Sequence, residues 1–471
     1  MKHWRHKVSE KVEIPKGWEW VIISEMIPHD GVFIDGDWIE SKDQDPNGDV
    51  RLIQLADIGD GYFRNKSSRF LTFKRANELN CTFLKKNDIL VARMPDPIGR
   101  ACMFPLKGSN SFVTAVDVAI IRLGENNINS KYLMHSINSL HIRREIEGLQ
   151  SGTTRKRISR SNLGIINFPI PPLPEQHRIV AEIEALFSSL DKGIESIKTA
   201  QQQLKVYRQA VLKWAFEGKL TNENVKDGEL PDGWKWVKLG DVIDKISDGP
   251  FGSNLKSSDY VEKGVRVIRL ENIGYMIFKN EYQSFVTEEK YDTIKKHTVY
   301  KGDIIFSSFI SDNIRAVILP DYIDRAINKA DCFLVRVSET EISKKFLSFY
   351  FSTRTIHNHL VNEIHGATRP RINTTQLKST QIPLAPLPEQ HRIVAEIESR
   401  LSVCDKLEES ITLSLKKAEA LRQSILKKAF EGKLVPQDPN DEPASVLLER
   451  IKAEKEKNMP EKKLKTKKKK Q

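Results

Sequence analysis

The chain contains one long sequence twice, and this repeat limits its architecture more than any other feature. The thirteen residues from Pro172 to Glu184, PLPEQHRIVAEIE, recur unchanged 214 positions later, from Pro386 to Glu398. Downstream, YRQAVLKWAFEGKL at Tyr207–Leu220 matches LRQSILKKAFEGKL at Leu421–Leu434 with the same offset. Solenoid repeats have periods of about 20–50 residues, so this period indicates duplication of a whole domain with its linker.

The duplication extends upstream, where only short landmarks match. VRLIQLADIG at Val50–Gly59 pairs with VRVIRLENIG at Val265–Gly274, and Asp88 of NDILVA pairs with Asp303 of GDIIFS. Between these landmarks the two halves disagree almost entirely. We therefore expect two modules that share one scaffold and carry different surfaces.

Within each half, the local patterns predict a mixture of strands and helices. Short β-branched runs bounded by Gly, Asp or Asn predict strands, and apolar residues spaced by three and four predict helices. The predicted strands are Val50–Ile58, Asp88–Arg93, Val118–Leu123, Val265–Ile273, Asp303–Ile310 and Cys332–Val337. The predicted helices are Lys131–Leu149 and Lys344–Ile364. Each module is therefore expected to be mixed α/β.

A proline-rich entry precedes a long amphipathic helix in each half. Proline fixes φ and disfavours helix for the residue before it, so PIPPLPEQ at 169–176 is expected to be extended. Apolar residues then alternate at +3 and +4 over about 40 residues, or roughly 60 Å of helix, as in a heptad seam. Polar residues interrupt the first seam at Gln201 and Arg208. The predicted pairing positions are Val180, Ile183, Phe187, Leu190, Val394, Ile397, Leu401 and Ile411.

Two such helices at matching phase predict an antiparallel coiled coil, whose register the polar seam positions can set. The fold class is then α/β, with two mixed modules separated by two long helices in a pseudo-two-fold internal repeat. The alternative is that each helix packs on its own module. The expected domains are 1–170 (first module), 171–220 (first helix), 221–384 (second module), 385–435 (second helix) and 436–471 (C-terminal extension).

The composition favours a soluble, cytoplasmic protein. The N-terminal sequence MKHWRHKVSEK has no apolar stretch that suits a signal peptide, and no apolar run approaches the roughly 18 residues of a membrane span. The four cysteines, Cys81, Cys102, Cys332 and Cys404, form no CxxC pair. Neither a disulfide framework nor a zinc site is therefore indicated.

The net charge of +12 is concentrated at the C-terminus. Residues 451–471 contain ten lysines and three glutamates, which leaves only +5 for the first 450 residues. The Lys-rich tail is most simply a disordered polycation that binds polyanions weakly. The charge alone is therefore a poor indicator of nucleic-acid binding.

The common catalytic motifs are missing from the sequence. GxxxxGK[ST] does not occur, and no GxGxxG opens a strand–helix unit, which weakens the case for a nucleotide, dinucleotide or methyl-donor site. His177 and His391 occupy the same position of both helices and have no neighbours at metal-ligand spacing. We therefore predict no catalytic residue and no metal ligand.

One basic element is repeated and suits nucleic-acid binding. SGTTRKRIS at 151–159 and HGATRPRIN at 365–373 share Gly, Thr and alternating arginines, which suit a tight turn that presents guanidinium groups to phosphates or guanine edges. The alternative is that these arginines pair with acidic groups where module meets helix. The candidate DNA-binding residues are Arg155, Lys156, Arg157, Arg369 and Arg371, with weaker candidates in other cationic loops at Arg64, Lys66, Arg69, Arg93, Arg100 and Lys256.

At this point the chain resembles the specificity (S) subunit of Type I restriction–modification enzymes. The resemblance rests on the PLPEQxxIV entry, the LDK within the first helix, the AFxGKL ending and the GDI-type strand in both halves. It covers essentially the whole chain, including Gly432–Lys455. One departure is that the first helix lacks the PQDPNDEPASVLLE continuation that follows the second. This departure puts exact symmetry of the two partner sites in doubt.

The resemblance implies a DNA reader without catalytic residues. Two target-recognition domains would each read one half of a bipartite, asymmetric site in double-stranded DNA, and the paired helices would set the gap. The helices would bind two methyltransferase (modification) subunits, with restriction and translocase subunits joining them. This chain would hold no cofactor, because S-adenosylmethionine, ATP and magnesium would belong to the partners.

Two other classes of function remain open at the sequence level. One is a self-contained enzyme, such as a DNA methyltransferase or nuclease with an unusual motif. The other is a coiled-coil scaffold whose modules bind proteins or RNA. Binding of S-adenosylmethionine by the purified chain would favour the first. Failure to enrich a bipartite site from a DNA library, with the methyltransferase partner present, would favour the second.

Overall fold

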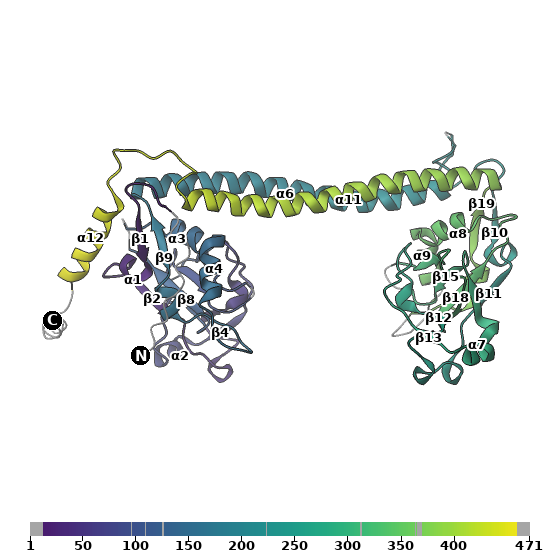
Figure 1. Ribbon diagram of the computed structural model, residues 1–471, viewed down its shortest axis with the longest axis horizontal. Helices are drawn as coiled ribbons and strands as arrows, with labels where there is room; N and C mark the ends of the chain where they lie inside the picture. The colour runs from purple at the N-terminus through teal and green to yellow at the C-terminus, as the bar shows by residue number, and fades with distance from the viewer. Residues whose placement is uncertain are drawn as a thin grey trace. The chain divides into compact units, whose positions relative to one another are not determined.

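The computed structural model describes residues 13–458, apart from gaps at 96, 109, 125–126, 223, 311–312, 363 and 365–369. It contains two compact units, one drawn from Met1–Glu195 and Ser414–Gln471 and the other from Ser196–Leu413. Each unit combines a module of strands and short helices with part of both long helices (Figure 1).

The module of the first unit is built on two sheets. One is antiparallel with strand order β2-β8-β5-β6, and the other has the order β4-β3-β7 with β3 and β7 parallel. Strands β1 and β9 pair separately. The strands are β1 Glu19–Ile22, β2 Val32–Asp35, β3 Val50–Ile53, β4 Arg69–Leu71, β5 Ile89–Ala92, β6 Ala101–Met103, β7 Phe112–Thr114, β8 Val118–Arg122 and β9 Asn167–Ile170. The helices are α1 Ile23–Met26, α2 Phe73–Glu78, α3 Ser130–Ile137, α4 Leu140–Gly148, α5 Arg160–Gly164 and α12 Ala444–Lys457.

The second unit repeats this plan with one more strand. Its sheets have the orders β11-β18-β15-β16 and β13-β12-β17-β14, and β10 pairs with β19. The strands are β10 Lys235–Lys238, β11 Lys245–Ser247, β12 Val265–Ile268, β13 Phe285–Val286, β14 Thr298–Tyr300, β15 Ile304–Ser307, β16 Ala316–Ile318, β17 Arg325–Asn328, β18 Cys332–Arg336 and β19 Gln381–Leu384. The helices are α7 Glu288–Ile294, α8 Lys344–Phe351, α9 Arg354–Asn362 and α10 Thr374–Ser379.

Strand β5 is buried on both faces of its sheet. Successive side chains of a strand point to opposite faces. Ile89 and Val91 accordingly lie in the core that includes the helices, and Leu90 and Ala92 lie in a second core on the other face. The continuous apolar run ILVA therefore marks a central strand.

Each of the two helices predicted at 131–149 and 344–364 is divided into two. In the first unit, α3 ends at Ile137 and α4 begins at Leu140, because the Ser139 hydroxyl accepts a hydrogen bond from the backbone N–H of Ile142. Thr353 does the same for α9 by accepting from the N–H of Ile356. A serine or threonine at the N-cap satisfies a helical N–H that would otherwise lack a partner, so it starts a new helix.

Hydrogen bonds between the repeated GW and PEQ motifs connect each module to its long helix. Trp18 donates its indole N–H to Glu175 over 3.0 Å, and Trp234 donates to Glu389 over the same distance. The neighbouring glutamines accept from the N–H at the start of α3 or α8 and donate to a carbonyl of the entry segment. These buried hydrogen bonds explain why the motif is unchanged between the halves.

The long helices α6 (Leu173–Phe216) and α11 (Leu387–Phe430) have 44 residues each and pair antiparallel. In the first unit the start of α6 shares a buried cluster with the end of α11, and in the second unit the end of α6 does so with the start of α11. Among the predicted pairing positions, Val180, Ile183, Val394, Ile397 and Leu401 are buried, and Phe187, Leu190 and Ile411 are half-buried.

Two equivalent ion pairs join the helices at the polar seam positions. Arg422 pairs with Asp191 in the first unit and lies 4.4 Å from the ring centroid of Phe187. Arg208 pairs with Asp405 at 2.6 Å in the second unit. Each arginine and each aspartate has its counterpart 214 residues away, so the same contact occurs twice.

We expect Asp191→Arg to destabilise the chain by about 1 kcal/mol, because it places two guanidinium groups together at a partly exposed site. The double variant Asp191→Arg/Arg422→Asp should recover most of this loss. Urea unfolding of both variants, with Asp191→Ala as the control, measures the coupling. Equal losses in the single and double variants would contradict a specific pair.

Candidate nucleic-acid interface

The predicted arginine loop of the first unit is a tight, solvent-exposed turn. Ser151 and Arg157 exchange backbone hydrogen bonds across it, and the N–H of Ile158 donates to the carbonyl of Arg93. Gly152 has a φ of +100°, and a Cβ there would lie 2.5 Å from the carbonyl oxygen of Arg155. This position therefore requires glycine. Arg155, Lys156 and Arg157 are exposed, and no ion pair is found for them among the described residues.

The corresponding loop of the second unit holds its arginine differently. Arg371 pairs with Asp331 at 3.2 Å and lies 4.8 Å from the ring centroid of Phe309. The N–H of Ile372 donates to the carbonyl of Ser308, as Ile158 does to Arg93. Arg369 lies outside the described residues. Arg371 thus has an acidic partner within its module, between β17 and β18, whereas no ion pair is found for Arg157 among the described residues.

The difference follows from the residue beneath each loop. Arg93 in the first unit occupies the position of Ser308 in the second, and its guanidinium pairs with Asp35. Burial, with a contribution from nearby Arg157, lowers the pKa of Arg93. The first loop therefore lies over a buried, ion-paired guanidinium that the second unit lacks.

The second unit has neutral Ser308 in place of Arg93 but keeps the acidic residue, because Asp248 follows β11 as Asp35 ends β2. Asp248 accepts a hydrogen bond from the N–H of Asp331, and burial raises its pKa to about 6. The ends of the two central sheets thus share a backbone arrangement but differ in charge.

Arg93 and Arg100 are buried and bonded to other groups of the module. They are not the exposed loop residues that the sequence around them predicts. Arg100 is 4% exposed and donates to the carbonyl oxygens of Ile58 at 2.7 Å and Leu55 at 2.9 Å. Its counterpart, Arg315, donates to Leu270 and Ile273. A guanidinium that donates to the same two carbonyl positions in both units supports the local fold and is turned away from solvent.

The cationic loop at 60–69 projects from a buried anchor, Asp57. This carboxylate is 0% exposed and accepts from the backbone N–H groups of Lys66 and Ser67. The loop therefore has a fixed base while its basic side chains face outward. Lys66 and Arg69 are exposed, half-buried Arg64 lies 5.8 Å from the centroid of the Tyr62 ring, and Tyr62 is 59% exposed. Basic groups beside an exposed aromatic ring suit a nucleic-acid surface.

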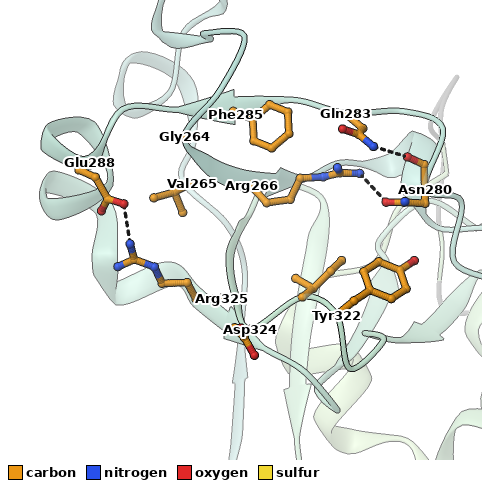
Figure 2. Close-up of a pocket in the computed structure, with 11 residues that line it drawn as sticks. Gly264, Val265, Arg266, Asn280, Gln283, Phe285, Glu288, Tyr322, Asp324 and Arg325 are labelled. Atoms are coloured by element: carbon orange, nitrogen blue, oxygen red, sulfur yellow. Dashed lines mark hydrogen bonds and ion pairs between the residues drawn. The ribbon is translucent and has the colours of Figure 1, made fainter.

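In the second unit Asn272 replaces Asp57 and anchors the loop by donating to the carbonyls of Lys279 and Tyr282. Beside this loop lies a pocket of about 410 Å³ (Figure 2). Figure 2 shows Arg266 pointing from β12 toward Asn280 and Gln283. The Arg266 guanidinium donates to the side-chain oxygen of Asn280 at 3.3 Å, as Arg51 does to Asn65 in the first unit at 2.7 Å.

This Arg–Asn pair was not singled out from the sequence, although a signal is present. Arg51 and Arg266 stand in the matched VRLIQ and VRVIR strands, and Asn65 and Asn280 recur at the same offset of 215 residues. Arginine recognises guanine edges, and asparagine or glutamine recognises adenine. Gln283 adds such a group in the second unit only, since Ser68 stands at its counterpart. Lys256, the remaining predicted residue, is exposed in a separate loop.

No described helix is long and apolar enough to cross a bilayer. The described residues also contain no group of three or more His, Cys, Asp or Glu placed to hold a metal ion.

Comparison with known proteins accounts for the duplicated plan. The Type I restriction modification DNA specificity domain matches the chain twice, at residues 15–206 and 231–417. The chain belongs to this family. Each copy of the sequence repeat therefore contains one specificity domain.

Curated relatives and solved structures agree with this assignment. The chain is 28% identical over 358 residues to the Type I restriction enzyme EcoBI specificity subunit of Escherichia coli, covering 72% of this chain and 74% of the relative. It is 28% identical over 350 residues to the StySPI specificity subunit of Salmonella potsdam, covering 70% and 73%.

Two solved chains share the fold. One, from a study of complex assembly and conformational transition of the type I R-M system, has a TM-score of 0.69 at 21% identity and covers 90% of this chain and 100% of that chain. The HsdS subunit from Thermoanaerobacter tengcongensis has a TM-score of 0.57 at 20% identity, with 90% and 99% covered. The predicted α/β fold with two modules and paired long helices is confirmed.

Proposed function

We propose that this chain is the non-catalytic DNA-reading subunit of a Type I restriction–modification complex. Each module reads one half of a bipartite, asymmetric site in double-stranded DNA. The observation that carries this proposal is that the two copies of the repeat share their buried contacts and differ in their exposed loops. Buried frame contacts such as Trp18–Glu175 and Trp234–Glu389 are equivalent, whereas the exposed loops that they support differ in charge and length.

Two divergent readers on one frame suit a site with two different halves. Discrimination of about 1–3 kcal/mol per base pair adds over well-separated positions, so two short readouts give one selective site. The arginine loops and the Arg51–Asn65 and Arg266–Asn280 pairs supply groups of the required chemistry. The remaining basic side chains would bind phosphates and hold the register.

The paired helices would set the unread gap and bind two modification subunits. Each long helix keeps exposed apolar side chains beside the seam, such as Val206 at 69% and Leu421 at 51%. The modification subunits would supply S-adenosylmethionine and methylate adenine, and the restriction subunits would supply the ATP- and magnesium-dependent steps. In this scheme the chain acts in the cytoplasm, holds no cofactor and contributes no catalytic residue.

Methylome sequencing of the source cell, with and without the gene, tests the proposal. We expect one gapped, asymmetric adenine-methylation motif to disappear with the gene and to return with the complementing gene. Replacing residues 235–384 with the second module of a relative should change one half of the motif and keep the other. An unchanged methylome in a cell with active modification subunits would reject the proposal.

The exposed arginines of the first loop give a sharper expectation. Arg155→Ala/Arg157→Ala should weaken DNA binding by the assembled complex about thirtyfold and reduce the slope of log affinity against log salt by about two. Because both side chains are exposed, the melting temperature should stay within about 1 °C. Arg450→Ala on α12 is the matched control, and equal affinities for both variants would contradict a DNA role for the loop.

A further inference from the structure

The first unit contains a cavity between its module and its helix pair. The cavity has a volume of about 700 Å³. Its apolar wall is formed by Trp20, Leu140, Ile142, Pro169 and Phe430. Its polar wall includes Ser136, Ser139, Gln423 and Lys427. His141, Arg144, Ser424 and Glu431 complete the polar wall. A cavity that combines an apolar wall with converging polar groups is a common form of ligand site.

The second unit shows what kind of group fills the equivalent space. Ser136 of α3 corresponds to Tyr350 of α8, because both helices begin 214 residues apart. The Tyr350 ring packs 5.1 Å from the ring of Phe216, whose counterpart Phe430 lines the cavity. A serine therefore stands where the repeat carries a phenol ring, and its smaller volume contributes to the cavity.

A second tyrosine is replaced in the same neighbourhood. The hydroxyl of Tyr275 accepts from the side-chain amide of Gln209 at 2.8 Å and donates to the carbonyl of Ser352 at 2.9 Å. The counterpart of Tyr275 is Asp60, which pairs with Arg143 at 2.7 Å. The counterpart of Gln209 is Gln423, on the cavity wall. The first unit therefore keeps the glutamine and lacks the phenol that binds it.

Two polar atoms of this wall lack partners, as expected for an incomplete site. The hydroxyl of Ser136 and the side-chain oxygen of Gln423 are both buried without a hydrogen bond among the described residues. Ser136 is 0% exposed. Buried polar groups without partners are rare in native proteins, because each one loses its hydration without compensation. A ligand that brings a hydroxyl into the cavity would satisfy them.

We propose that this cavity receives a tyrosine side chain from a protein that docks along the helix pair of the first unit. The ring would pack between Trp20 and Phe430, and its hydroxyl would donate to the unpartnered side-chain oxygen of Gln423. Leu140, which is 47% exposed at the rim, offers an apolar entrance, whereas its counterpart in the second unit is Arg354. The identity of the docking protein as a modification subunit rests on the proposed function.

The cavity is tested first without any partner. We expect N-acetyl-L-tyrosinamide to bind the full chain with a dissociation constant of about 1–10 mM, and several times more tightly than N-acetyl-L-phenylalaninamide. Methyl NMR signals of Ile142 report occupancy. Ser136→Tyr, which copies the second unit, should reduce this binding at least tenfold. Binding that is equal in this variant, or no binding by the parent chain, would overturn the proposal.

The partner is tested with the same variants in assembly with the modification subunit. Ser136→Tyr should weaken assembly about thirtyfold, the effect expected for loss of a buried aromatic anchor. Leu140→Arg, at an exposed rim position, should weaken it too and serves if Ser136→Tyr folds poorly. Glu147→Tyr adds the same ring at an exposed position of α4 outside the cavity and should leave assembly unchanged.

Two outcomes would reject a partner's tyrosine as the occupant and would still be consistent with a cavity that binds a ligand. Normal assembly of Ser136→Tyr would show that no partner side chain enters. Tighter tyrosinamide binding after deletion of residues 1–12, which include Trp4, would identify the chain's own N-terminal segment as the occupant. Failure of the proposed function is separate, because it is read from the methylome and not from ligand binding.

Discussion

Deleting one heptad from each long helix is expected to move the methylated motif to a gap about three base pairs shorter. The deletion removes 196–202 from α6 and 411–417 from α11. Seven helical residues rise about 10 Å, which corresponds to roughly three base pairs of duplex. Methylation at the original motif should fall more than a hundredfold, and the shortened motif should appear in the methylome.

The chosen segments follow from the register of the helix pair. Arg422 lies opposite Asp191, and Arg208 lies opposite Asp405; in both pairs the two residue numbers add to 613. The deleted segments are chosen by the same rule, since 196 and 417 add to 613, as do 202 and 411. A heptad also preserves the phase of the apolar seam, and both ion pairs remain outside the deletion.

Two controls separate a ruler from a loss of folding. Deletion of 196–202 alone removes the register match and should abolish both motifs. Deletion of four residues from each helix shifts the seam by an incomplete heptad and should unfold part of the pair. An unchanged gap preference after the matched deletion would reject the helix pair as the element that sets the gap.

Replacing Arg100 with methionine is expected to destabilise the first unit by about 3 kcal/mol and to lower its melting temperature by roughly 6–12 °C. The change removes a buried guanidinium whose donors meet the carbonyls of Leu55 and Ile58. These carbonyls form the short turn before the cationic loop, so the loop should loosen as well. Urea denaturation and hydrogen exchange at residues 55–69 measure the two effects.

Arg315→Met is the matched control in the second unit. Arg315 donates to the corresponding carbonyls, but over 3.3–3.5 Å and from a half-buried position. Its loss should therefore be smaller, about 1–2 kcal/mol. If Arg100→Met left the free energy of unfolding unchanged and only weakened DNA binding, Arg100 would contact DNA and would not support the fold.

The helix pair was predictable from the sequence because its signal is long and periodic. Val180, Ile183, Val394 and Ile397 recur at helical spacing in two copies, and the structure buries all four. The polar interruptions were predictable as register positions for the same reason. Naming the partner of each arginine required knowing how far the helices overlap.

The exposure of individual basic residues was not predictable. Arg93 and Arg157 lie in similar Gly- and Arg-rich contexts, but Arg93 directly follows β5 and pairs with Asp35, while a turn leaves Arg157 in solvent. The breaks at Ser139 and Thr353 were missed because apolar spacing continues across them. Arg51 and Asn65 lie 14 residues apart, and only the fold of β3 and its loop brings them together.

The composition of the first unit has a consequence for biosynthesis. Its core contains Ile425, Phe430 and Leu447 from the end of the chain, and the N–H of Ala444 donates to the carbonyl of Gly17 near the beginning. The second unit uses only the continuous stretch Ser196–Leu413. A ribosome therefore releases every part of the second unit before it has made the last part of the first. The module translated first is the last to be completed, because its core includes Leu447 and Ile451.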